Sequence, residues 1–231
     1  MAFVIPQPPV AAVPVKGSRD TFPVRRIYCV GRNYVEHAQE MGHTGREPPF
    51  FFTKPADAIV PVPDGETGRI DYPSLTKNLH HEIELVVAIG KGGREIRASD
   101  ALAHIWGYAV GLDMTRRDLQ NDAKKQGRPW CIGKAFEQSA PIGPLHPIKF
   151  TGELASGAIT LKVNGQLKQK GDLKDLIWNV GEIIAHLSAG WTLQPGDLIY
   201  TGTPAGVAAV VSGDVMEGEI AGLSILRVAV K

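Results

Sequence analysis

The sequence has very little cysteine, which excludes several classes of protein. Its 231 residues include only 2 cysteines, Cys29 and Cys131, which form neither a CxxC pair nor a disulfide framework. Such sparse cysteine is typical of a protein in a reducing compartment. We therefore expect two buried thiols rather than a disulfide-stapled secreted domain.

The chain has almost no net charge, and its sequence predicts neither a membrane span nor an N-terminal leader. Its 25 lysines and arginines balance 24 acids to a formal charge of +1, so no global field favours nucleic acid or a membrane surface. No stretch reaches the roughly 18 apolar residues that span a bilayer, and prolines interrupt the first residues. We expect a cytoplasmic protein that binds any anionic ligand through local contacts.

The length is that of one large domain, which can bury a sizeable core. Residues 1–25 are rich in proline and aperiodic, so they form either an extended arm, packed on the surface or on a partner subunit, or a disordered tail. From Arg26 onward, short apolar runs are broken by Gly, Pro and Asn, a pattern typical of strands. The chain therefore divides into an arm, 1–25, and a second region, 26–231.

Expected strands outnumber expected helices in this second region. The predicted strands cover residues 27–30, 50–52 (buried), 81–89, 106–113, 159–163, 166–170 and 198–201, with a last pair between 218 and 230. The predicted helices cover 33–41, 99–104 (capped by Ser99), 115–126 and 180–189. Asn164-Gly165 predicts a type I′ hairpin turn. Because strands and helices do not alternate, we predict a β-rich mixed α+β fold rather than a Rossmann or TIM pattern.

Two acids interrupt an otherwise apolar predicted strand. Glu82 and Glu84 are two residues apart, which places both carboxylates on one face of a strand, about 7 Å from each other. Like charges on a half-buried surface are unfavourable unless a cation lies between them. The spacing alone leaves two interpretations open: a site for a divalent cation, or the solvent face of an amphipathic strand.

Asp113 ends the next predicted strand and is a third ligand if the two strands converge. Three carboxylates without cysteine favour Mg²⁺ or Mn²⁺, since hard cations select oxygen ligands. The tandem His80-His81 does not form the HExxH motif of zinc enzymes, and adjacent strand residues point to opposite faces. These histidines are therefore expected to support the site rather than to bind zinc.

Several short motifs occur in the order typical of the fumarylacetoacetate hydrolase family. They are Cys29-Val30-Gly31-Arg32-Asn33-Tyr34, then His37 and Glu40, His81-Glu82-Ile83-Glu84, Gly107-Tyr108 to Asp113-Met114-Thr115, Gly133-Lys134, and Thr201-Gly202-Thr203-Pro204 with Gly206-Val207. Over about residues 25–231 the chain resembles the short acylpyruvate and fumarylpyruvate hydrolase branch. The resemblance implies a domain of rolled, mixed β-sheets and a homodimer.

The resemblance also implies a role for individual residues. Glu82, Glu84 and Asp113 match the metal ligands, and Lys134 matches an active-site lysine. His37 and Glu40 match an acid–base pair on a helical lid, where i and i+3 share a face. The polar residues that match the substrate side of the site are Arg117, Gln120 and Thr203. By contrast, Arg116, Lys124 and Lys125 are expected to be solvated.

The implied activity is metal-dependent hydrolysis of a carbon–carbon bond in an acylpyruvate, a small anionic 2-oxo acid. His37, polarised by Glu40, would activate water, and Lys134 with Gln120 would stabilise the oxyanion. Arg32 and Lys54 are candidates for contacts to a fumaryl tail, although Lys54 could equally snorkel from its strand. The N-terminal arm and Phe50–Phe52 resemble proteins of aromatic catabolism through gentisate, which favours fumarylpyruvate.

Two other functions stay open at this point. The same metal site would serve an oxaloacetate decarboxylase, in which no nucleophilic water is needed. A metal-binding scaffold that has lost its chemistry is a third possibility. The presence of His37, Glu40 and Lys134 beside all three acids argues against the scaffold, because binding alone needs no acid–base pair.

Overall fold

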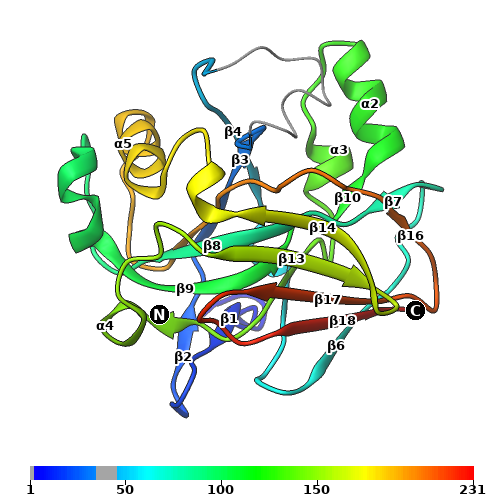
Figure 1. Cartoon of the computed structure of the whole chain (residues 1–231), viewed down its shortest axis with the longest axis horizontal. Helices are drawn as coiled ribbons and strands as arrows, with labels where there is room; N and C mark the ends of the chain where they lie inside the picture. The colour runs from blue at the N-terminus through cyan, green and yellow to red at the C-terminus, as the bar shows by residue number, and fades with distance from the viewer. Residues whose placement is uncertain (1–2, 35–45) are drawn as a thin grey trace.

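The computed structural model describes residues 3–34 and 46–231. Curved β-sheets make up most of the molecule, and short helices lie around them (Figure 1). The helices of the described residues are η1 (Ala56–Ala58), η2 (Ala98–His104), α2 (Arg117–Lys125), α3 (Cys131–Lys134), α4 (Ile148–Thr151), η3 (Leu173–Asp175) and α5 (Val180–Gly190). The predicted β-rich α+β class is confirmed.

The larger sheet runs through the centre of the molecule. Its strands, in spatial order, are β4 (Phe50–Lys54), β3 (Arg26–Gly31), β15 (Asp197–Tyr200), β8 (Ile83–Ile89), β9 (Ile105–Leu112), β11 (Ala140–Ile142) and β5 (Ile59–Pro61), and β12 (His146–Pro147) also pairs with β9. The β3–β15 and β5–β11 pairs are parallel, and the other pairs are antiparallel.

Strand β8 is buried on both faces, which explains its nearly continuous apolar sequence. Leu85 and Val87 pack in the main core on one face, whereas Val86 and Ala88 pack in a second core on the other. Side chains alternate along a strand. Glu84, the one charged residue of β8, therefore lies on the same face as Val86.

A second sheet packs against the first. Its order is β14 (Gln166–Asp172), β13 (Ala158–Val163), β17 (Val215–Ile220), β18 (Leu226–Val230) and β6 (Thr67–Ile70). The packing is tight, because a Cβ added at Gly218 would lie 3.0 Å from Ile83 of β8. The predicted hairpin turn between β13 and β14 is confirmed, since Asn164 and Gly165 have φ of 50° and 78°.

A small sheet and two helices lie near one end of β8 and β9. The sheet contains β10 (Thr115–Arg116), β7 (Leu79–His80) and β16 (Ala209–Val210). Helices α2 and α3 lie next to it (Figure 1). At the other side of the molecule, α5 begins with a capping box between Asn179 and Glu182, which explains why the predicted helix starts there.

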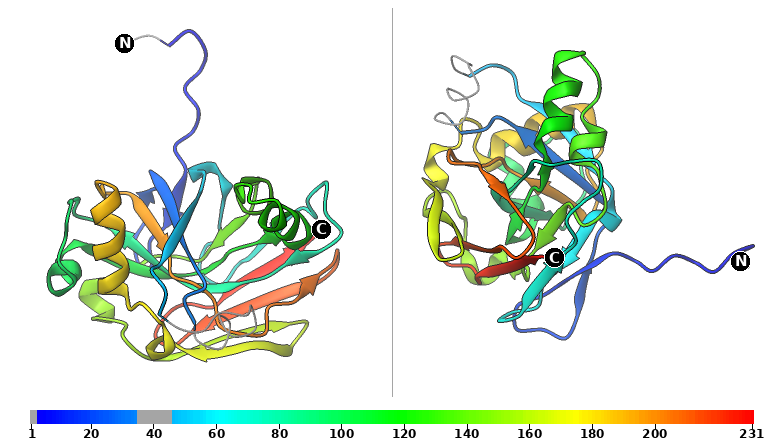
Figure 2. Two further views of the ribbon diagram at one scale, coloured as in Figure 1. Left: turned by 90° about the horizontal axis from the view of Figure 1, so that it is seen from above. Right: turned by 90° about the vertical axis from the view of Figure 1, so that its right-hand side faces the viewer.

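The N-terminal arm is more ordered than its composition predicts. Strands β1 (Ala12–Pro14) and β2 (Thr21–Pro23) pair with each other, and Val13 and Phe22 are buried. Before β1 the chain runs away from the body of the molecule (Figure 2). The second half of the arm packs on the body and the first half extends away from it, because only the second half supplies apolar side chains that reach the core.

Several local predictions were wrong, because tertiary contacts set the boundaries of these elements. Strand β8 begins at Ile83 rather than at residue 81. Thr115 belongs to β10, so helix α2 begins two residues later. Ser99 does not cap η2, which begins after Arg97 without a side-chain cap.

Two predictions of burial were also wrong. Phe50 is 37% exposed and its two neighbours are partly exposed, because β4 is an edge strand of the large sheet. Cys29 is buried as expected, but Cys131 is exposed at the start of α3. The helix predicted over 33–41 lies mostly outside the described residues.

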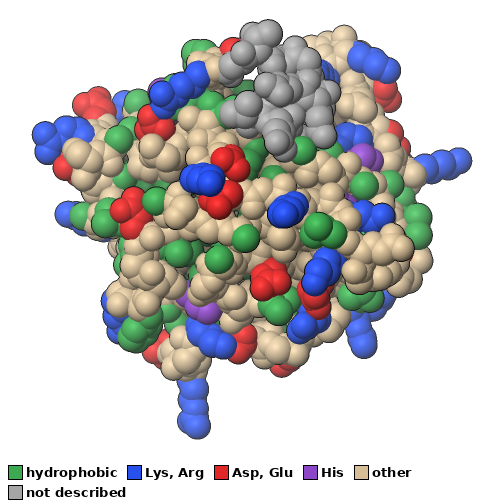
Figure 3. Space-filling model, viewed as in Figure 1, with side chains coloured by type: hydrophobic (Ala, Val, Ile, Leu, Met, Phe, Trp, Pro, Cys, Tyr) green, Lys and Arg blue, Asp and Glu red, His purple; other side chains and the backbone are tan. Residues whose placement is uncertain are grey.

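The surface in Figure 3 carries charges of both signs, interspersed with apolar and neutral groups. This pattern agrees with the formal charge of +1. Among the described helices, none has the length and apolar character needed to cross a membrane.

Candidate metal and substrate site

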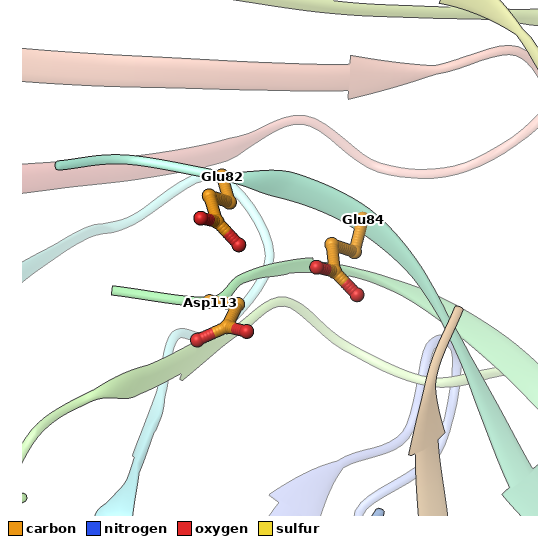
Figure 4. A group of neighbouring side chains, drawn as sticks. All are labelled: Glu82, Glu84 and Asp113. Carbon is orange, nitrogen blue, oxygen red and sulfur yellow. The ribbon is translucent and has the colours of Figure 1, made fainter. Parts of the chain in front are cut away.

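Three buried carboxylates meet at the end of β8 and β9. One oxygen from each of Glu82, Glu84 and Asp113 lies within 4.8 Å of the others. Their side chains come from neighbouring segments and turn toward a common space (Figure 4). All three residues are at most 5% exposed, so the solvent-face interpretation of the two glutamates is wrong.

Antiparallel pairing of β8 and β9 brings the acids together. Glu84 stands opposite Gly111 in the register, and the N–H of Asp113 donates to the carbonyl of Glu82 at 2.8 Å. A Cβ at Gly111 would lie 2.5 Å from Val86 and 2.7 Å from Tyr200. The glycine therefore leaves room for close packing beside Glu84. Glu82 precedes β8 rather than lying in it, but the two glutamates still converge.

Lys134 lies among the acids. Its Nζ is 2.8 Å from Glu82 Oε2, 2.8 Å from Asp113 Oδ2 and 2.7 Å from the Thr115 hydroxyl. Burial opposes protonation of this lysine, but attraction to Asp113 and Glu82 outweighs burial and raises its pKa. Lys134 therefore stays charged and offsets part of the buried negative charge.

Two further cations, Arg117 and Lys54, contact the acids. Arg117 donates from Nη2 to Glu82 Oε1 and from Nη1 to Gln120 Oε1, the latter at 2.6 Å. Lys54 Nζ lies 2.9 Å from Asp113 Oδ1. Its hydrogen bonds, however, go to the carbonyls of Met114 and Lys134. Among the described residues, Asp113 Oδ1 has no hydrogen-bond donor of acceptable geometry, so it keeps a lone pair for another ligand.

Glu84 is the least compensated of the three acids. Burial, followed by repulsion from Asp113 and Glu82, raises its pKa well above the usual value. The backbone N–H of Gly202 donates to its Oε2 at 2.7 Å. Gly202 has φ of 101°, and a Cβ there would lie 2.7 Å from Asn33. Gly202 is thus needed for the loop to approach Asn33 closely, and its N–H donates a hydrogen bond to Glu84.

Gln169 of β14 ties the acid-bearing segment to the loop of Thr203. Its Oε1 accepts from the backbone N–H of Ile83 at 3.1 Å and lies 2.8 Å from His81 Nδ1. Its Nε2 donates to the Thr203 hydroxyl and the Pro204 carbonyl, both at 2.8 Å. Nothing in the sequence marks this residue, because β14 reads as an exposed polar strand except at this buried position.

The histidines before Glu82 support the site, as expected. His81 is buried, and burial lowers its pKa. Because Gln169 accepts at its Oε1, the ring donates from Nδ1. The His80 ring faces Asn78 and the Nε of Arg117, and burial lowers its pKa to about 4.

A cleft brings most of the predicted substrate residues next to the three acids. Its lining includes Arg32, Arg117, Gln120, Lys134 and Thr203. Arg117 and Gln120 share one buried face of α2, as the i, i+3 spacing predicts. Trp130 and Phe52 also line the cleft, and their part in the site was not predicted.

The remaining predicted residues lie elsewhere. The side chain of Lys54 has no exposure and sits behind Asp113, so the snorkelling alternative is wrong. Arg116 is not solvated but buried, with its guanidinium carbon 4.3 Å from the Phe136 ring centroid. Lys124 and Lys125 are exposed, as expected. His37 and Glu40 lie outside the described residues.

The fold and the site define a class: rolled, mixed β-sheet proteins with a buried carboxylate triad in a cation-lined cleft. The chain belongs to the fumarylacetoacetate hydrolase family, because the family's C-terminal domain matches residues 26–231. The predicted family membership is thereby confirmed.

The chain is also similar to individual proteins of known activity or structure. The chain is 48% identical to the fumarylpyruvate hydrolase of Ralstonia sp. over 185 residues, which are 80% of this chain and 93% of that protein. It is 40% identical to the mitochondrial oxaloacetate tautomerase of Mus musculus, over 90% of this chain and 92% of that one. A crystal structure of fumarylpyruvate hydrolase from Pseudomonas aeruginosa with Mn²⁺ and pyruvate superposes with a TM-score of 0.98, at 55% identity, covering 99% of both chains.

Proposed function

We propose that this protein is a Mg²⁺- or Mn²⁺-dependent hydrolase that cleaves fumarylpyruvate to fumarate and pyruvate. The observation that carries the proposal is the buried convergence of Glu82, Glu84 and Asp113, with one oxygen of each within 4.8 Å of the others. The high similarity to two fumarylpyruvate hydrolases, one with Mn²⁺ and pyruvate, supports the substrate and the metal.

The residues present fit a hard divalent cation. The donors are carboxylate oxygens without sulfur, and Asp113 Oδ1 has a lone pair that no described donor uses well. Glu82, Glu84 and Asp113 would hold the ion. When bound, it would supply Lewis-acid stabilisation to the enolate charge that forms as the carbon–carbon bond breaks.

The charge of the site supports a dianionic substrate. Three buried acids face three buried cations, Lys54, Lys134 and Arg117, so their formal charges cancel. A divalent ion adds two positive charges, and burial of unbalanced charge is unfavourable. Because Arg32 also lines the cleft, the site with its ion carries excess positive charge, which favours a 2-oxo acid with a second carboxylate over a monoanionic acylpyruvate.

The protein's own side chains would orient the substrate and stabilise its charge. Arg117 and Gln120 are locked together on α2 and face the cleft, where they would position the carboxylate of the 2-oxo acid. Lys134 would stabilise, through its positive charge, the oxyanion formed when water attacks the distal carbonyl. Its contact with Thr115 holds the ammonium in place.

The proton transfers are assigned to residues outside the described part of the chain. His37 would accept a proton from the attacking water, and Glu40 would hold the imidazole in the useful tautomer. Asn33 supports this assignment indirectly. Its side chain is anchored by the carbonyls of Trp178 and Thr201, so the chain enters that segment from a fixed point beside the site.

We further propose a cytoplasmic homodimer that acts in the breakdown of aromatic compounds. The exposed apolar side chains before β1, Phe3, Ile5 and Val10, support a partner subunit, because this first part of the arm runs away from its own chain. The two free cysteines agree with a reducing compartment.

A substrate panel tests the activity. Fumarylpyruvate, acetylpyruvate and oxaloacetate are each assayed with EDTA and with added Mg²⁺ or Mn²⁺. The proposal predicts metal-dependent loss of the ultraviolet absorbance of enolised fumarylpyruvate, with fumarate and pyruvate as products. Turnover of oxaloacetate alone would assign the lyase or tautomerase instead. Metal binding without any turnover would support a scaffold.

A further inference from the structure

A second cavity opens beside the cleft of the three acids. It has a volume of about 530 Å³, and it shares Arg32, Phe52, Trp130 and Lys134 with the cleft. Lys134 therefore stands at the boundary, with its ammonium among the acids and its Nζ 5.1 Å from the centroid of the Phe52 ring. A ligand held at the acids can extend directly into this cavity.

Aromatic rings form the walls of the cavity. The Trp130 ring lies edge-on to Phe50 at 5.3 Å between centroids and tilted against Phe52 at 5.8 Å. This contact joins the edge strand β4 to the segment before α3. Phe50 and Phe52, which were predicted to be buried, keep part of their surface exposed where they line the cavity. Flat apolar walls suit a planar, conjugated chain.

The charged residues of the cavity are all cationic. Arg32, Arg128 and Lys134 line it, and no Asp or Glu of the described residues does so. Lys134 is already engaged by the acids. Arg128 is different: its guanidinium has no side-chain hydrogen bond or ion pair among the described residues. It can therefore bind a carboxylate without giving up another partner.

The backbone holds Arg128 at this position. Helix α2 ends at Lys125, Gly127 takes φ of 62°, and the N–H of Arg128 donates to the carbonyl of Ala123 at 2.8 Å. This is the hydrogen bonding of a helix C-terminus closed by a left-handed glycine. The same helix carries Arg117 and Gln120, so one rigid element would contact both ends of a substrate.

We propose that this cavity binds the acyl half of the substrate and that Arg128 binds its distal carboxylate. The protein then selects acylpyruvates whose acyl group is planar and ends in a carboxylate. This inference rests on the proposed function. It replaces Lys54 as the contact for the distal carboxylate, because Lys54 is buried behind Asp113.

The test compares two substrates in one variant. Arg128→Gln should lower kcat/KM for fumarylpyruvate by about 10- to 100-fold, the range of one lost charge-assisted hydrogen bond. It should leave kcat/KM for acetylpyruvate, which has no distal carboxylate, within about twofold. Lys125→Gln removes an exposed charge from the same helix end, outside the cavity, and should change neither value. Equal losses for both substrates, or no loss for either, would overturn the proposal.

A binding experiment separates failure of the subsite from failure of the proposed function. With the Mn²⁺-loaded protein, Arg128→Gln should weaken fumarate binding about 10-fold or more and leave pyruvate binding unchanged. Cys131 is exposed and lines the cavity, whereas Cys29 is buried. Fumarate should therefore slow alkylation of Cys131 by iodoacetamide in the wild type but not in the variant. If both effects occur without hydrolysis of fumarylpyruvate, the subsite is supported and the proposed activity is wrong. If fumarate does not protect Cys131 and fumarate binding does not depend on Arg128, the proposed subsite is wrong.

Discussion

Replacing Glu84 by glutamine tests the metal site with little change in shape. The amide has nearly the same size as the carboxylate, and its oxygen can still accept from the N–H of Gly202. What is lost is one negative charge among three buried acids. We therefore expect opposite effects on metal binding and on the stability of the metal-free protein.

The size of the first effect follows from Coulomb's law. Unit charges about 4 Å apart attract by about 4 kcal/mol at an effective dielectric constant of about 20, which is close to a 10³-fold change in dissociation constant. A divalent ion doubles this attraction, but the hydration that the unbound ion has in water offsets part of it. Glu84→Gln should thus weaken Mn²⁺ binding by about 10³-fold and abolish turnover.

The second effect has the opposite sign. Burial and its neighbours raise the pKa of Glu84, so the charged form destabilises the metal-free fold at neutral pH. The neutral amide removes this repulsion, and the melting temperature without metal should not fall. Added Mn²⁺ should raise it in the wild type but far less in the variant.

Calorimetric titration with Mn²⁺ and thermal melts with and without EDTA measure both effects. Glu219→Gln, which neutralises an exposed acid on β17, is the matched control and should change neither. Unchanged Mn²⁺ affinity in Glu84→Gln would refute the assignment of Glu84 as a metal ligand. A large fall in the metal-free melting temperature would show a structural role instead.

Three further predictions test other parts of the account. Lys134→Met should destabilise the metal-free protein by about 3–5 kcal/mol, because it leaves buried carboxylates uncompensated, and denaturant titration should show partial recovery with Mn²⁺. His37→Ala should keep Mn²⁺ affinity but lower kcat by roughly 10²–10⁴-fold; an equal loss of metal affinity would contradict its acid–base role. Gly107→Ala should destabilise by about 1–3 kcal/mol, because its Cβ would lie 2.2 Å from the His146 carbonyl, whereas Gly190→Ala meets nothing within 4 Å and should be neutral or stabilising.

The carboxylate site was only partly predictable from the spacing of its residues. Two acids in an apolar strand and a third at the end of the next strand left a shared cation and a solvent-facing strand both open, and the family resemblance decided between them. The hairpin at Asn164-Gly165 was predictable, since positive φ at two adjacent positions strongly restricts the residue type. The hairpin constraint acts within two residues, whereas Asp113 joins the two glutamates only through the pairing of β8 with β9.

Other features depend on which segments meet in space. Gln169 lies in a strand of polar residues, and only packing of β14 against the loop of Thr203 turns it into a buried anchor. Arg116 lies in a polar stretch that was predicted to be a helix, but the ring of Phe136 covers it. Phe50 reads as core because it is apolar, whereas β4 lies at the sheet edge. Tertiary contacts decide all three, and no local pattern reports them.

Crystals of the protein soaked with Mn²⁺ show directly whether the three carboxylates bind one ion. Anomalous scattering should show one strong peak bounded by Glu82, Glu84 and Asp113, at roughly 2.0–2.2 Å from one oxygen of each, the range of hard-cation carboxylate bonds. A protein that turns over fumarylpyruvate while its only anomalous peak lies away from these three residues would contradict the account.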